Sequence, residues 1–98
     1  MLGPLLIVAA FASPAIEPQN AALNCMVRET NRLASDPKQA AEFRRWTRWE
    51  ATRLLWSLAG DSAKCAQAFR VLRPTDETSN AAYRHADHLV VRKHLYRD

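Results

Sequence analysis

The sequence predicts an all-α fold: a small antiparallel helical bundle of about four helices, one of them short, after an N-terminal signal-like segment. Apolar residues recur at the helical period of about 3.6 residues through most of the chain. Only two glycines occur in 98 residues, which argues against a β-rich fold with many tight turns. A chain of this length forms one domain at most.

Residues 1–15, MLGPLLIVAAFASPA, predict a signal peptide. The apolar run at residues 5–12 has the length of a signal-peptide core and is too short to span a bilayer. Small residues allow cleavage before Ser13 or before Ile16. No Lys or Arg precedes the run, and Pro4 comes early, so a retained segment and a membrane anchor remain as alternatives. We expect residues 16–98 to form the helical domain.

The first predicted helix runs from about residue 20 to residue 34. Asn20 is a residue type that can cap a helix start. The apolar stripe of this helix comprises Leu23, Met26, Val27, Thr30, Leu33 and Ala34. Such a stripe is wide enough to face a core.

The second predicted helix has the clearest start signal, Ser35-Asp36-Pro37, in which a polar cap precedes a proline at the first helical position. We expect it to continue to about residue 59 and to end at Gly60, because glycine readily adopts the left-handed conformation that closes a helix.

Two further helices are expected. Asp61 and Ser62 can cap a short helix that reaches about residue 72, before Pro74. Thr78 or Ser79 can cap the last helix, from about residue 80. Its apolar stripe comprises Ala82, Ala86, Leu89, Val90 and Tyr96, with Tyr83 at the edge.

On one continuous helix, the second predicted segment has two apolar faces. Phe43, Ala51 and Leu55 belong to the side that would face a core. The tryptophans fall mostly on the other side, where Arg45, Trp49, Arg53 and Trp56 follow one another at helical spacing, and Trp46 lies nearest the Phe43 side. At steps of three and four, guanidinium groups can lie over indole rings.

These residues leave two interpretations open. Other helices can cover both faces, or the Trp/Arg face can stay partly open as a docking surface for a protein, an anionic envelope component or a membrane interface. We expect Trp46 to be the most buried of the three tryptophans, with Trp49 and Trp56 more accessible.

The two cysteines, Cys25 and Cys65, predict one disulfide bond, since an even count after a signal peptide favours pairing. A helical domain this small is marginally stable without such a staple. Cys25 lies off the apolar stripe of its helix, so two separate thiols remain the alternative.

The histidines His85 and His88 are three residues apart and can share one helix flank. A tight metal site needs a third or fourth ligand, and Arg92 on the same flank would repel a cation. We interpret the pair as a solvated polar flank and expect no metal or cofactor. A metal-binding stress protein is retained as an alternative.

The sequence contains no signature of a catalytic nucleophile with its base, of a carboxylate pair or of a glycine-rich phosphate loop. The 14 basic and 10 acidic side chains are interspersed, so the net charge of +4 does not form a nucleic-acid-binding tail. We expect a secreted or periplasmic, non-catalytic binding protein whose partner is an unknown protein. An envelope-associated amphipathic protein that contacts anionic lipid or polymer is the alternative.

Overall fold

The computed structural model of the chain describes residues 16–73 and 76–98, and in these residues the fold is all-helical, as predicted. The segment predicted to be a signal peptide lies outside the described residues. The helices are α2 (Ile16–Ser35), α3 (Pro37–Phe43), α4 (Arg48–Asp61), α5 (Ala66–Val71) and α6 (Glu77–Arg92). None of these helices is long and apolar enough to cross a membrane.

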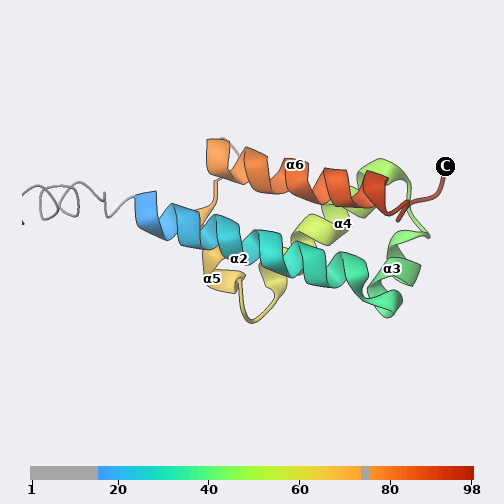
Figure 1. The fold of residues 1–98 in the computed structure, drawn as a ribbon, viewed down its shortest axis with the longest axis horizontal. Helices are drawn as coiled ribbons and strands as arrows, with labels where there is room; N and C mark the ends of the chain where they lie inside the picture. The colour runs from blue at the N-terminus through green and yellow to red at the C-terminus, as the bar shows by residue number, and fades with distance from the viewer. Residues whose placement is uncertain (1–15, 74–75) are drawn as a thin grey trace, which may run out of the picture.

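Three long helices form the body of the domain. Figure 1 shows α2 and α6 side by side and running in the same direction, with α4 crossing behind them in the opposite direction. Two side-chain contacts agree with this direction. Asn31 on α2 contacts His85, and the later residue Ser35 contacts the later residue Lys93. Consecutive long helices are therefore antiparallel, and the short helices α3 and α5 make the connections.

The start of α2 differs from the prediction. The helix begins at Ile16, so Asn20 lies within it and is not its cap. Pro18 falls in the first turn, where a missing backbone N–H removes no intrahelical hydrogen bond.

The predicted second helix is wrong as one continuous element, because it breaks after Phe43. Asp36 caps α3 as expected, and its Oδ1 accepts a hydrogen bond from the Lys38 N–H at 2.9 Å. A turn over residues 44–47 then separates α3 from α4. Thr47 caps α4 in a capping box, in which the Glu50 carboxylate accepts a hydrogen bond from the Thr47 N–H at 3.1 Å.

Gly60 does not end α4, as the sequence had predicted. It is buried inside the helix, which continues to Asp61, and it has no positive φ. The ring of Phe69, on α5, lies so close that a Cβ at position 60 would overlap it. Gly60 is therefore a site of close helix packing.

The last two helix starts also shift. α5 begins only at Ala66, and Asp76, rather than Thr78 or Ser79, occupies the N-cap position of α6. Ser79 is buried inside the helix.

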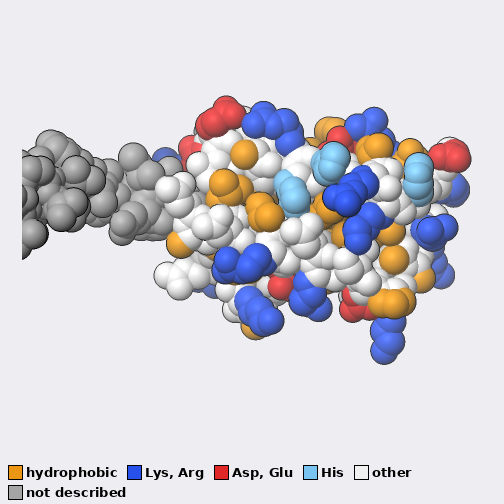
Figure 2. Space-filling view, in the orientation of Figure 1, with side chains coloured by type: hydrophobic (Ala, Val, Ile, Leu, Met, Phe, Trp, Pro, Cys, Tyr) orange, Lys and Arg blue, Asp and Glu red, His pale blue; other side chains and the backbone are white. Residues whose placement is uncertain are grey.

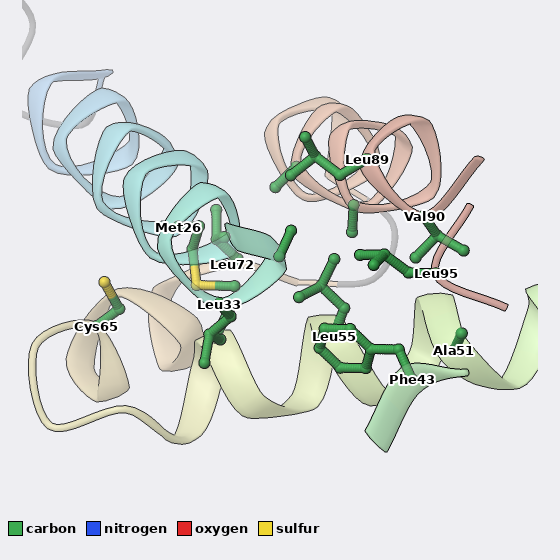
Figure 3. Packing of buried hydrophobic residues seen from close by; sticks show 14 of the residues in the cluster. Met26, Leu33, Phe43, Ala51, Leu55, Cys65, Leu72, Leu89, Val90 and Leu95 are labelled. Atoms are coloured by element: carbon green, nitrogen blue, oxygen red, sulfur yellow. The ribbon is translucent and has the colours of Figure 1, made fainter. Parts of the chain in front are cut away.

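The core lies among α2, α4 and α6 and is closed at one end by Phe43 and by the C-terminal segment (Figure 3). After α6, His94 adopts a left-handed conformation with φ of 52°, which turns Leu95 back into the core. The backbone N–H of Arg97 then donates to the Trp46 carbonyl at 2.7 Å. The C-terminal segment thus holds the turn between α3 and α4 in place.

Candidate binding surface

Four aromatic side chains form a continuous row across α4, α5 and α6, which we call the aromatic row: Trp49, Trp56, Phe69 and Tyr83. Trp49 and Trp56 lie seven residues apart on α4, so they project from the same helix face. Tyr83 packs edge-on against both, with ring centroids 6.0 Å from Trp49 and 5.7 Å from Trp56. Phe69 extends the row, 5.5 Å from Trp56.

The row is unevenly exposed. Trp49 is 63% exposed, whereas Trp56 is half-buried between Tyr83 and Phe69. The prediction that Trp46 is the most buried tryptophan is wrong, because its side chain is 39% exposed and Trp56 is less accessible. Trp46 belongs to the turn before α4. The expectation that it is buried on the Phe43 side assumed one continuous helix through this turn, and that helix is not present.

Two hollows adjoin the aromatic row, and Tyr83 lines both. The larger, of about 480 Å³, is lined by Thr47, Arg48, Trp49, Tyr83, Arg84 and Asp87. The smaller, of about 310 Å³, is lined by Trp56, Phe69, Leu72, Ser79, Asn80 and Tyr83. The row therefore presents one protruding indole beside concave apolar surface, which is the shape of an anchor-and-pocket interface.

Charges around the larger hollow are largely compensated. Arg48 binds Asp87 through two hydrogen bonds, of 3.2 and 2.7 Å, and the Thr52 hydroxyl lies 3.2 Å from the same carboxylate. The Arg48 guanidinium holds the pKa of Asp87 below its ordinary value. Burial raises the pKa of Tyr83, and the charge of Asp87 adds to this rise. Arg84 pairs with Glu77 at 3.1 Å.

The residues of the predicted Trp/Arg face separate into three places. Trp49 and Trp56 join the aromatic row. Trp46 and Arg53, together with Glu50 and Leu54, line a different hollow of about 220 Å³. Arg45 lies in the turn and pairs with Glu42 at 3.4 Å.

The sequence interpretation missed Tyr83, Phe69 and Asp87 as members of this surface. The signals for them were indirect: Tyr83 lies at the edge of the α6 apolar stripe, and Asp87 follows it one turn later. Their grouping with Trp49 depends on how α4 crosses α6, which local periodicity does not specify.

His85 and His88 do not form a common flank of solvated imidazoles. His88 is exposed, whereas His85 is half-buried and its Nε2 lies 3.2 Å from the Asn31 side-chain oxygen. Burial, with a smaller effect from His88, lowers the pKa of His85. In the described part of the chain, no three His, Cys, Asp or Glu side chains gather as a metal site.

The predicted disulfide bond between Cys25 and Cys65 is present, and its Cα atoms are 5.8 Å apart. It joins α2 to the segment that enters α5 and closes a sequence separation of 40 residues. Cys65 is 1% exposed, whereas Cys25 is half-buried and lines a hollow. A disulfide is consistent with an extracellular or periplasmic protein, because such bonds persist in oxidising compartments.

Comparison of the chain with protein-family models, with curated proteins and with solved structures gave no match.

Proposed function

We propose that the protein is a small exported, non-catalytic binding protein that docks a partner protein through the aromatic row. The observation that carries this proposal is the exposure of Trp49, an indole that is 63% accessible beside an apolar hollow of about 480 Å³. Large aromatic side chains that stay exposed next to a pocket are the residue type most often found at the energetic centre of protein interfaces.

A protein partner fits this surface better than an anionic polymer does. Arg48 and Arg84 are paired with Asp87 and Glu77, which leaves Arg53 as the cation near Tyr83 that forms no ion pair among the described residues. A mainly apolar interface with a few paired charges at its edge matches the usual composition of protein–protein contacts.

The polar groups at the row favour binding over catalysis. Asp87 is the carboxylate of the larger hollow, and Arg48 and Thr52 already bind it. A carboxylate held in this way, with a lowered pKa, is a poor general base at neutral pH.

Export is the second part of the proposal, supported by the disulfide bond and by the apolar residues 1–15. Mass spectrometry of the protein recovered from its own cells tests it. We expect a chain that begins at Ser13 or Ile16 and carries two fewer hydrogens than the dithiol form. A cytosolic chain that retains residues 1–15 with free thiols contradicts export.

The docking test places a photo-crosslinking amino acid at position 49 of the protein in its native cells and identifies the linked partner by mass spectrometry. Affinity for the purified partner is then compared between the wild type and Trp49→Ala. We expect Trp49→Ala to weaken binding by about 30-fold or more, the loss typical of an interface anchor worth about 2 kcal/mol.

Val71→Ala is the matched control, because Val71 is an exposed apolar side chain, 39% accessible, outside the aromatic row. This variant should keep the wild-type affinity. Unchanged binding by Trp49→Ala, or an equal loss in both variants, contradicts docking through the row.

A further inference from the structure

A further hollow, of about 300 Å³, lies beside the disulfide bond and shares no residue with the aromatic row. We call it the disulfide hollow; its lining residues are Cys25, Arg28, Glu29, Arg32, Lys64 and Cys65. Figure 2 shows Lys and Arg side chains spread over the visible face of the molecule, including its lower edge. Its chemistry therefore differs from that of the row.

Three cations and one carboxylate line the disulfide hollow. Glu29 is only 4% exposed and binds Arg32 through two hydrogen bonds, of 2.5 and 3.1 Å. The Arg32 guanidinium holds the pKa of Glu29 below its ordinary value against the opposing effect of burial, and the charge of Lys64 assists. Glu29 therefore stays ionised and orients Arg32 at the wall of the hollow.

The other two cations are not compensated in this way. Among the described residues, neither Arg28 nor Lys64 forms an ion pair. Arg28 and Arg32 lie one turn apart on α2, a spacing at which like charges repel and weaken a helix. Two positive charges thus remain in excess at one concave place on the surface.

The disulfide bond keeps these cations together. Cys65 is the neighbour of Lys64 in the chain, and Cys25 lies three residues before Arg28 on α2. The bond between the two cysteines therefore holds the Lys64 segment against the α2 face that carries both arginines. A set of like charges that a covalent bond holds in place does not stabilise the fold, and it is preorganised for an anion.

We propose that the disulfide hollow binds a doubly charged phosphate group, as in a phosphate monoester. Two uncompensated cations match two negative charges. Guanidinium groups offer paired N–H donors that suit phosphate oxygens, and the ammonium of Lys64 supplies a third direction of contact. A volume of about 300 Å³ admits the phosphate and part of the group that carries it.

The test measures binding of glycerol 3-phosphate to the oxidised protein by calorimetry, at low and at physiological salt. We expect saturable 1:1 binding that weakens by at least about tenfold in the double variant Arg28→Gln/Lys64→Gln, because two charge-assisted hydrogen bonds are lost. Both side chains are exposed, so the variant should fold normally.

The matched control is Arg70→Gln/Arg73→Gln, which removes the same charge from another basic hollow, on α5 and the segment after it. This variant should bind glycerol 3-phosphate within about twofold of the wild type, since long-range charge effects on exposed groups are screened by salt. An equal loss in both double variants overturns the proposal, and so does the absence of saturable wild-type binding both to glycerol 3-phosphate and to phosphatidic acid in vesicles.

Vesicles separate the two sources of such a phosphate group. Phosphatidylcholine vesicles that contain phosphatidic acid present the phosphate monoester at a membrane surface, and vesicles with phosphatidylglycerol present a singly charged diester. Binding to the first that depends on Arg28 and Lys64 identifies a lipid headgroup as the ligand. Saturable binding to glycerol 3-phosphate without vesicle binding identifies a soluble ligand, and failure of both contradicts the site. None of these results depends on the aromatic row.

Discussion

The aromatic row and the disulfide hollow are two surfaces of one small domain that differ in chemistry. At the row, Trp49 is 63% exposed while the nearby arginines Arg48 and Arg84 are paired with carboxylates. At the hollow, Arg28 and Lys64 stand unpaired in the described structure, beside a covalent bond. Packing therefore organises the first region, and a crosslink organises the second. Positive charge is therefore largely paired beside Trp49, although Arg53, which forms no ion pair among the described residues, lines the separate hollow beside Trp46.

The largest effect should follow removal of the crosslink. Replacing Cys25 and Cys65 together by Ala frees a loop of 40 residues, which in the chain-entropy model destabilises the fold by about 4 kcal/mol. Since ~1 kcal/mol shifts the melting temperature of a domain this small by about 4–8 °C, the loss should be plain in a thermal scan. A loss below about 1 kcal/mol would mean that apolar packing alone holds α5.

The next effect should appear within the aromatic row. Trp56 contacts both Tyr83 and Phe69 and is half-buried, so Trp56→Ala should lower the free energy of unfolding by about 2–4 kcal/mol. Trp49→Ala should cost less than about 1 kcal/mol, because that side chain is 63% exposed. Denaturant titration of both variants measures the difference. Equal losses would show that Trp49 is part of the fold and not a free anchor.

A smaller effect should occur where α5 packs against α4. Gly60→Ala would raise intrinsic helix propensity by up to about 1 kcal/mol, but the added Cβ would overlap the Phe69 ring. We expect overpacking to prevail and the variant to lose about 1–3 kcal/mol. The double variant Gly60→Ala/Phe69→Leu should lose less than the two single losses combined, and a double-mutant cycle measures this coupling. Stabilisation by Gly60→Ala alone would contradict the close packing.

Local patterns in the sequence were sufficient for the fold class but not for the junctions. Residues close together in the sequence were enough to predict the apolar stripes of α2 and α6 and the helix start at Asp36-Pro37. The even number of cysteines was enough to predict the disulfide bond. The break before α4 was missed although Thr47 and Glu50 spell a capping box, because the apolar period continues across residues 44–47. A continuing period does not prove a continuous helix.

The candidate surface was predictable only along one helix. Spacing on α4 correctly placed Trp49 and Trp56 together, since both residues lie in the same unbroken element. Tyr83 and Phe69 reach them from other helices, and their positions depend on tertiary packing. Trp46 was misplaced because the same angular count was carried through a turn. Gly60 was wrongly predicted to end its helix for a related reason. The residue that packs against it, Phe69, belongs to a different helix, so a helical wheel does not bring the two together.

The smallest expected effect concerns the paired charges of the row. The pKa of Asp87 is lowered in the folded state, chiefly by the Arg48 hydrogen bonds. A carboxylate with a lowered folded pKa stabilises the protein fully above its unfolded pKa of about 4 and loses that contribution as pH falls through the lower folded value. Because Arg48 and Asp87 are partly exposed, solvent screens the pair and we expect its contribution to be small. Asp87→Asn should therefore be less stable than the wild type at pH 7, and the difference should shrink below about pH 4.

Glu77→Gln is the control, since Glu77 and its partner Arg84 are 83% and 66% exposed and their pair should contribute little. Urea titrations at a series of pH values measure both variants. A deficit of Asp87→Asn that persists unchanged at the lowest pH would show that the carboxylate contributes through its shape and neutral hydrogen bonds and not through its charge.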